Sequence, residues 1–361
     1  MKQRLHYIDI ARAFAILFIV LGHTLVHSEH CALVYKFIYS FNVAMFFVLS
    51  GLTFKINIEE KFTHFLSKKL VRIMIPYFVW AILFIIPYLL FGGDVNDSLG
   101  TNGSFSLNQI FADILYGNGD KSALKQNTAL WFLPALFSME IIFYFVIRLS
   151  YKALLRTKIF ILAIIVLIGY IANAFLPVQL PWGINTTLTV GAFFYIGYLF
   201  REYKLLEKNS LVLRIYFIFP ILIIGLLACF TNQQISWKNY NYGNLTLALI
   251  SGLCVSLFVI YISILISKNK VLEYFGRNTM GILIFHKLAI VIFQTKLGRI
   301  SDLLMDSNIF VEVILSILIV ILSVICSLIA TAIVRRILPV LIGESRKQPV
   351  FKKKQLPSQS D

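Results

Sequence analysis

Apolar runs of about twenty residues recur along the whole chain and alternate with shorter polar segments. A helix of that length crosses a hydrocarbon core of roughly 30 Å, so each run is a candidate transmembrane span. The runs lie at residues 7–27, 34–54, 71–91, 128–148, 159–176, 186–200, 211–230, 244–266, 278–294 and 309–334. The pattern predicts an all-α, polytopic membrane protein with about ten transmembrane helices.

Basic residues between these runs concentrate on alternate connections, starting before the first run and ending after the last. By the positive-inside rule, both termini are therefore expected to be cytoplasmic. The connections on the opposite side are poor in lysine and arginine, and residues 231–243 contain only Lys238. The longest of them, 92–127, is rich in Gly, Asn, Ser and Asp, and is either a solvated connector or a functional loop.

Composition and charge agree with a membrane location. Hydrophobic residues make up 59% of the 361 residues, against about 45–50% in soluble domains. The net charge of +16 is spread over short segments, so it predicts contact with membrane lipids and no nucleic-acid partner. We expect one transmembrane domain over residues 1–341 and a short basic cytoplasmic tail over 342–361. The histidines and cysteines show no HExxH or CxxC spacing, so no metal is expected.

The first span places two ionisable side chains on one helix face. Arg12 and His23 are eleven residues apart, which is three turns plus about 20° of rotation and about 16 Å along the helix axis. Asp9 lies three residues before Arg12, where its carboxylate can pair with the guanidinium. Ionisable groups inside a span are costly, so they normally face a cavity or a partner.

Each of these residues also has a purely structural interpretation. Arg12 can extend to the cytoplasmic headgroups, and His23 can be a buried histidine bonded to a neighbouring helix. The shared face favours a functional role, as does Gly22, which removes bulk beside the histidine. Histidine suits proton abstraction because its neutral ring is basic at cell pH.

Several stretches resemble known motifs. The segments YIDIARAFAILFIVLGH, FNVAMFFVLSGLTF and SKKLVRIMIPYFVW look like the opening of the membrane acyltransferase type three family, whose members O-acylate cell-surface carbohydrates. ALWFLPALFSMEIIFYF and FGRNTMGILIFHKL resemble its fucose 4-O-acetylase-like branch. The resemblance covers about the first ninety residues and is local at the two later motifs.

The resemblance implies acetyl transfer from cytoplasmic acetyl-CoA, with no permanently bound cofactor. The family's paired arginine and histidine fall on Arg12 and His23, and its cytoplasmic basic pair falls on Lys69 and Arg72. Lys69, Arg72 and Arg12 would hold the coenzyme A phosphates, although Lys69 replaces an arginine and so lacks the guanidinium fork. His23 would deprotonate a sugar hydroxyl or take the acetyl group itself.

Other polar residues are candidates for substrate contacts. An oxyanion in the reaction needs a hydrogen-bond donor, for which the candidates are Ser50, Asn42 and Trp131. Glu140 and His286 lie deep in spans, where they would orient the histidine of the first span, bind the sugar or bond helix to helix. Lys287, beside His286, is interpreted as facing water or extending outward.

The sequence thus predicts an O-acetyltransferase of the plasma membrane, the inner membrane in a bacterium. Its acceptor would be a hydroxyl of a surface polysaccharide or a lipid-linked sugar. An alternative is a transporter or flippase of a lipid-linked sugar, in which Arg12, His23, Glu140 and His286 form a binding or proton pathway. A third hypothesis, a non-catalytic partner in glycan assembly, would tolerate the loss of His23.

Overall fold

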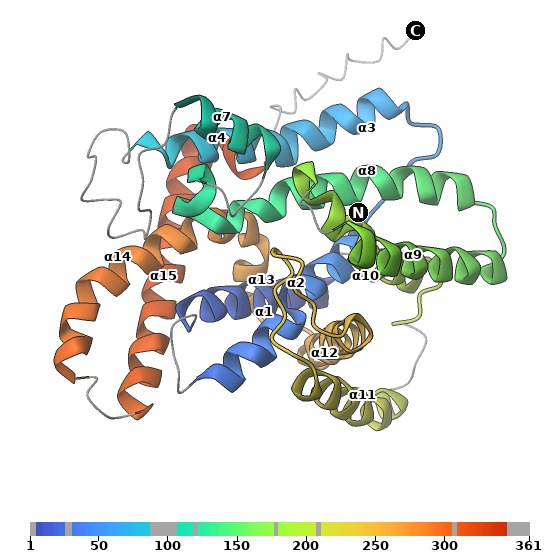
Figure 1. Cartoon of the computed structure of the whole chain (residues 1–361). Helices are drawn as coiled ribbons and strands as arrows, with labels where there is room; N and C mark the ends of the chain where they lie inside the picture. The colour runs from blue at the N-terminus through green and yellow to red at the C-terminus, as the bar shows by residue number, and fades with distance from the viewer. Residues whose placement is uncertain are drawn as a thin grey trace, which may run out of the picture.

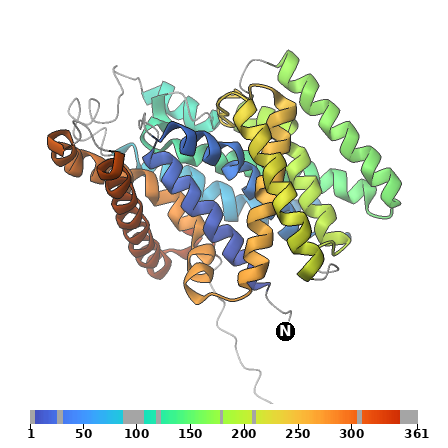
Figure 2. The ribbon, with the colours of Figure 1, turned by 90° about the horizontal axis from the view of Figure 1, so that it is seen from below.

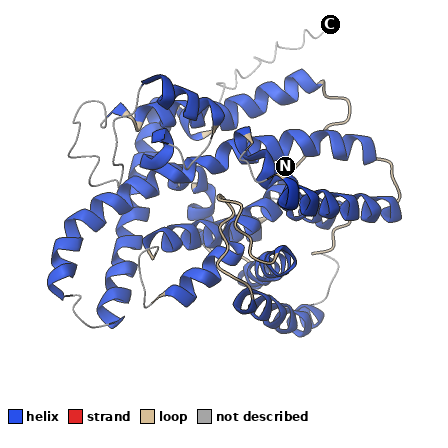
Figure 3. Cartoon of the chain, viewed as in Figure 1, coloured by secondary structure: helices blue, strands red, loops and turns tan. Residues whose placement is uncertain are grey.

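The computed structural model of the protein describes residues 5–25, 31–86, 107–117, 122–176, 180–206, 211–304 and 309–344. Within these ranges helices dominate and no strand is present, apart from an isolated antiparallel bridge between Ser236 and Asn241 (Figure 3). The predicted all-α fold is confirmed.

The long helices follow the predicted apolar runs. They are α1 (His6–Thr24), α2 (Ala32–Thr53), α8 (Phe132–Ser150), α9 (Leu155–Phe175), α10 (Ile184–Glu202), α11 (Leu211–Thr231), α12 (Leu245–Ile266), α14 (Thr279–Leu304) and α15 (Ile309–Ile337). The shorter elements are α3 (Phe62–Lys69), η1 (Leu70–Met74), α4 (Ile75–Leu83), α7 (Leu107–Tyr116), η2 (Ser122–Trp131), η3 (Pro181–Gly183), α13 (Lys270–Arg277) and η4 (Pro339–Ile342).

Among the described residues, seven helices are long and apolar enough to cross a membrane, or eight if the bent pair α13 and α14 forms one span. The chain is therefore a multi-pass membrane protein. α11 occupies the run predicted at 211–230, and α4 occupies part of the run predicted at 71–91, whose residues 87–91 lie outside the described ranges. The count of ten spans and the cytoplasmic termini stay predictions.

Helix α1 lies in the middle of the bundle, where it contacts α2, α12, α13, α14 and α15 (Figure 1). Helices α9 and α15 lie at opposite edges (Figure 2). Both edge helices expose large apolar side chains, among them Leu167 and Phe175 on α9 and Ile314 on α15. Such an apolar surface matches the lipid of a bilayer. Because α1 lies in the middle of the bundle, its polar residues are enclosed by other helices and are not exposed to the bilayer.

Two glycines set the crossing of α2 and α10. A Cβ atom on Gly51 would lie 2.0 Å from the carbonyl oxygen of Phe194, and one on Gly197 would lie 2.1 Å from that of Val48. Both residues therefore have to be glycine for the backbones to approach this closely, as at many small-residue crossings in membranes. Gly51 belongs to the motif FNVAMFFVLSGLTF of the family resemblance, so part of this motif serves helix packing.

Helices α3 and α4 are joined by a π turn that contains Arg72. Pro76 lacks the N–H group that would bond to the Arg72 carbonyl four residues earlier, and its ring crowds that turn, so the helix widens. Gly343, with a φ of +71°, packs against this turn, because a Cβ there would lie 2.6 Å from the Arg72 oxygen. Trp80 Nε1 donates to the Leu341 carbonyl at 2.7 Å. These contacts fix the turn η4 to the Arg72 turn.

The residues that follow η4 also pack against the bundle. Ile342 is buried, and Glu344 accepts hydrogen bonds from Arg335, the shortest at 2.7 Å. Arg335 also donates to the Asn278 side chain at 2.7 Å. Residues 345–361, most of the predicted tail, lie outside the described ranges, so the predicted domain boundary stays a prediction.

Candidate active site

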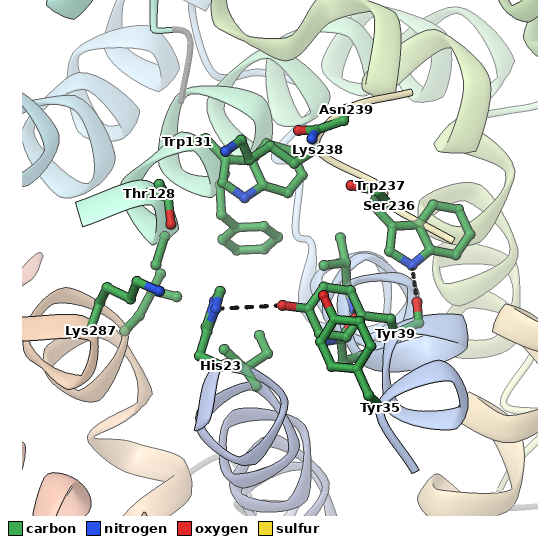
Figure 4. Close-up of a pocket in the computed structure, with 16 residues that line it drawn as sticks. His23, Tyr35, Tyr39, Thr128, Trp131, Ser236, Trp237, Lys238, Asn239 and Lys287 are labelled. Atoms are coloured by element: carbon green, nitrogen blue, oxygen red, sulfur yellow. Dashed lines mark hydrogen bonds between the residues drawn. The ribbon is translucent and has the colours of Figure 1, made fainter. Parts of the chain in front are cut away.

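A pocket of about 250 Å³ lies at the C-terminal end of α1 (Figure 4). Its lining residues are Ile19, His23, Tyr35, Tyr39, Asn42, Val43, Thr128, Ala129, Trp131, Phe132, Ser236, Trp237, Lys238, Asn239, Leu283 and Lys287. They come from α1, α2, η2, α8, α14 and the connection between α11 and α12. A concave space where distant segments meet is typical of a ligand site between the helices of a bundle.

His23 is held between side chains of two other helices. The Tyr39 hydroxyl of α2 lies 3.5 Å from His23 Nδ1 (Figure 4), and the ring of His286 on α14 lies 5.3 Å from the His23 ring between centroids. Gly22 permits this arrangement, because a Cβ there would lie 2.9 Å from Tyr39 Cε2. The expected role of Gly22, removal of bulk beside the histidine, therefore corresponds to space for Tyr39.

His286 lies behind His23 and does not line the pocket. Its side chain is buried, and its Nδ1 lies 2.8 Å from the Ile282 carbonyl. A carbonyl only accepts, so Nδ1 carries the hydrogen and Nε2 keeps its lone pair. Among the described residues, no hydrogen bond to the buried Nε2 is found. This placement fits an orienting role for His286 better than direct contact with a sugar.

One face of α2 supplies the predicted candidate Asn42 and two tyrosines that sequence reasoning had missed. Tyr35, Tyr39 and Asn42 are spaced at i, i+4 and i+7, so they share a helix face, and all three line the pocket. The rings of Tyr35 and Tyr39 lie 4.2 Å apart between centroids. Trp237 Nε1 donates to the Tyr39 carbonyl at 2.7 Å and fixes the α11–α12 connection to α2. The signal in the sequence was the helical spacing of Tyr35 and Tyr39 relative to Asn42, which places all three side chains on one helix face.

The three candidate oxyanion donors separate in space. Asn42 and the half-buried Trp131 line the pocket, whereas Ser50 does not. Ser50 lies about two turns further along α2, and its carbonyl accepts from Thr53 Oγ1 at 3.3 Å. The structure therefore brings Asn42 and Trp131 to His23 and leaves Ser50 away from it.

The predicted donor-binding cations gather at the other end of α1. Arg12 Nη2 donates to Thr53 Oγ1 at 3.1 Å, and Lys69 Nζ lies 5.5 Å from the ring centroid of the adjacent Phe54. Arg72, three residues beyond Lys69, is exposed. We call this part of the molecule the Arg72 end and the pocket region the His23 end.

Lys69 forms an ion pair with Glu140, with 2.7 Å between Nζ and Oε2. Their side chains are only 18% and 12% exposed. The structure therefore places Glu140 at the Arg72 end and not beside His23. Because the charge of Lys69 is already compensated, Arg72 is the better placed of the two to meet an anionic ligand. Asp9 is buried in α1, and its pairing with Arg12 stays a prediction.

Glu60 lies in the connection between α2 and α3 at the same end. Lys68 Nζ donates to its Oε1 at 2.6 Å, and this hydrogen bond, with the nearby positive charges, lowers the pKa of Glu60. The Glu60 carbonyl accepts from Arg148 Nη1 at 3.0 Å. In the described part of the chain, no group of three or more His, Cys, Asp or Glu side chains is arranged to hold a metal ion.

The fold defines a multi-pass membrane protein, and the pocket beside His23 is its candidate ligand site. A family model described as an acyltransferase domain, Acyl_transf_3, matches residues 5–334. The chain belongs to the membrane acyltransferase 3 family, and the predicted family is confirmed over most of the chain. Neither the curated proteins nor the solved structures contain a match. The fucose 4-O-acetylase-like branch stays a prediction.

Proposed function

We propose that this membrane acyltransferase transfers acetyl from acetyl-CoA to a sugar hydroxyl, with His23 as the general base. The observation that supports this is the position of His23, which lines a pocket between helices and lies on the same helix as Arg12. The volume of about 250 Å³ is below the roughly 300–1,000 Å³ of drug-sized sites, so it suits a single sugar ring. We assign the acceptor to a surface polysaccharide or lipid-linked sugar at the plasma membrane.

The two nitrogens of His23 have different roles in this mechanism. The mechanism requires the tautomer in which Nδ1–H donates to the Tyr39 oxygen 3.5 Å away, because the lone pair of Nε2 is then left to take the proton of the sugar hydroxyl. The sugar oxygen attacks the thioester carbonyl carbon, and the resulting tetrahedral intermediate collapses with loss of the coenzyme A thiolate. The imidazolium then returns its proton to the sulfur. Tyr39 and His286 act on the reaction through His23 and are positioning residues.

The oxyanion of the tetrahedral intermediate needs a donor near His23. The Asn42 side-chain oxygen accepts from the Val43 N–H at 2.7 Å, so its Nδ2–H group is the one offered to the pocket. A preorganised donor in a site of low dielectric stabilises developing negative charge strongly. We therefore assign oxyanion stabilisation to Asn42.

The donor would enter from the Arg72 end. Arg72 binds the coenzyme A phosphates as the exposed cation, and Arg12 lies further along the path. The separation of Arg12 and His23, about 16 Å along α1, is then spanned by the long pantetheine arm. Donor and acceptor thus occupy opposite ends of the same helix, and the acetyl group meets the sugar at His23.

The test compares surface glycans from cells that lack the native protein and carry either wild type, His23→Ala or His64→Ala at matched membrane levels. His64 is an exposed histidine at the Arg72 end and serves as the control. Wild type and His64→Ala are expected to add the mass of an acetyl group, and His23→Ala is expected to lose about 10²- to 10⁴-fold of that activity. Unchanged glycan mass with wild type would refute acetyl transfer, and full activity of His23→Ala would refute its role as base.

A further inference from the structure

The short helix η2 supplies one wall of the pocket beside His23. Two of the lining residues that it contributes, Thr128 and Trp131, carry hydrogen-bond donors. They are three residues apart, and side chains at i and i+3 of a 3₁₀ helix lie on one face. Figure 4 shows both side chains on the same side of the pocket, above His23. η2 therefore presents a hydroxyl and an indole N–H group to a ligand in the pocket.

Contacts within the protein hold this wall in place. Asn127 leaves the helical conformation, with φ −143° and ψ 77°, and its Nδ2 donates to the Ile284 carbonyl of α14 at 2.6 Å. The Trp131 ring packs edge-on against the Phe132 ring, with 6.2 Å between centroids and an interplanar angle of 86°. A donor that is already oriented loses little freedom when a ligand binds, so these contacts favour recognition by this wall.

Trp131 differs from the other three tryptophans of the chain in the partner of its indole nitrogen. The Nε1 atoms of Trp80, Trp182 and Trp237 each donate to a backbone carbonyl at 2.7 Å, those of Leu341, Leu115 and Tyr39 respectively. For Nε1 of Trp131, no acceptor is found among the described residues. An indole N–H inside a protein usually has a hydrogen-bond partner, and it can only donate. An oxygen atom of the ligand would supply this partner.

We propose that Trp131 determines the acceptor specificity: its Nε1–H donates to one ring hydroxyl of the bound sugar while a different hydroxyl of the same ring faces His23. The acceptor is then a sugar with at least one further free hydroxyl. A site that pairs with a substrate hydroxyl rejects an analogue that lacks it, because the protein donor is left unpaired. The role of the bound sugar as acyl acceptor rests on the proposed function, whereas its recognition by Trp131 does not.

The test measures binding of the methyl glycosides of glucose, galactose and mannose to the purified full-length protein in detergent. Saturation-transfer NMR detects weak binding and needs no acyl transfer. Wild type is expected to bind at least one of the three sugars. Trp131→Phe keeps an aromatic ring but removes the N–H group, so it should bind that sugar about 2- to 10-fold more weakly, as expected for one neutral hydrogen bond. Trp182→Phe removes an indole N–H that bonds to Leu115 away from the pocket, and this matched control should bind like wild type.

Deoxy analogues of the sugar that binds identify the hydroxyl concerned. One analogue should bind wild type about 2- to 10-fold more weakly than its parent sugar, yet bind Trp131→Phe as well as the parent does, because the hydrogen bond is already lost in the variant. If Trp131→Phe weakens the parent and every deoxy analogue equally, the role of Trp131 is only structural and the proposal fails. Absence of sugar binding to wild type, or undiminished binding to Trp131→Phe, would also overturn it.

Steady-state kinetics separates recognition of the acceptor from the chemical step. Trp131→Phe is expected to raise KM for the acceptor sugar with kcat nearly unchanged. A fall in kcat at unchanged KM would instead make Trp131 a donor to the oxyanion and overturn the proposal. Sugar recognition through Trp131 in a wild-type protein that transfers no acetyl group would refute the proposed function and leave the recognition site standing.

Discussion

The two ends of the bundle handle charge in different ways. At the Arg72 end, a cation such as Lys69 is paired with a carboxylate, that of Glu140. At the His23 end, two lysines line a pocket whose described lining contains no acidic side chain. A count of basic residues therefore overstates the positive charge that the Arg72 end offers to a ligand.

Further ion pairs extend this contrast. Lys158 pairs with Glu202 at the end of α10, and the neighbouring Arg201 donates to the Phe54 carbonyl next to the Lys69 side chain. These pairs hold helix ends together, as buried charges do when they are compensated. Paired cations of the Arg72 end thus serve structure, whereas Lys238 and Lys287 at the His23 end line a pocket.

Breaking an ion pair of the Arg72 end is expected to have the largest effect. Glu140→Ala leaves the mostly buried Lys69 without its carboxylate, and loss of one partner of a buried pair typically costs about 3–5 kcal/mol of folding free energy. Unfolding of the detergent-solubilised protein measures the loss. The double variant Glu140→Ala, Lys69→Met should recover most of the lost folding free energy. If Glu140→Ala alone is as stable as wild type, the ion pair contributes nothing to stability.

Arg72→Ala is expected to weaken donor binding next most strongly. Removing a charged hydrogen bond to a phosphate costs about 1.5–3 kcal/mol, so KM for acetyl-CoA should rise about 10- to 100-fold with kcat nearly unchanged. Lys68→Ala, at an exposed lysine paired with Glu60, is the control and should leave KM as it is. An equal loss of kcat in Arg72→Ala would instead place Arg72 in the chemical step.

Tyr39→Phe is expected to have a smaller effect confined to the His23 end. It removes the hydroxyl 3.5 Å from His23 Nδ1, and a neutral hydrogen bond is worth about 0.5–1.5 kcal/mol, so kcat should fall about 2- to 10-fold. KM for acetyl-CoA should not change, because the donor cations lie at the other end. Steady-state kinetics separates the two constants. A raised KM for acetyl-CoA would show that the two ends are not independent.

The pH dependence of stability at Glu60 should be the smallest effect. The hydrogen bond from Lys68 lowers the Glu60 pKa below its ordinary value of about 4.5, so the contribution is present above that pH. It is lost as pH falls through the lowered pKa, and it amounts to at most about 1 kcal/mol because Lys68 is exposed. The free energies of unfolding of wild type and Lys68→Ala should therefore converge as pH falls from about 4.5 through the lowered pKa. A difference that persists in acid would contradict this assignment.

The helices could be predicted from the sequence because a span needs only a sufficiently long apolar run. The breaks between helices could not be predicted in the same way. α13 and α14 meet at an angle of 79° beside Asn278, whose side chain bonds to the Tyr274 carbonyl and to Arg335, far along the chain. Such a bend depends on tertiary partners that no local pattern contains.

The same limit applies to the site. His23, Asn42 and Trp131 could be identified because each is a polar or aromatic residue within one apolar run. Such a residue can be recognised from the local sequence, without knowledge of tertiary contacts. The partner of Glu140 and the direction of Lys287 depend on which helices meet. Lys287 was expected to face water or extend outward, and the structure places it in the lining of the pocket beside His23.

The packing of the turn η4 against the Arg72 turn is a late step when the protein folds during its synthesis. Chains emerge from the ribosome N-terminal end first, and their early helices insert while later ones are still being translated. Gly343 and Leu341 brace the widened turn at Arg72, so a nascent chain that already contains both His23 and Arg72 still lacks this brace. The Arg72 end is therefore completed only after the last described helix has been made.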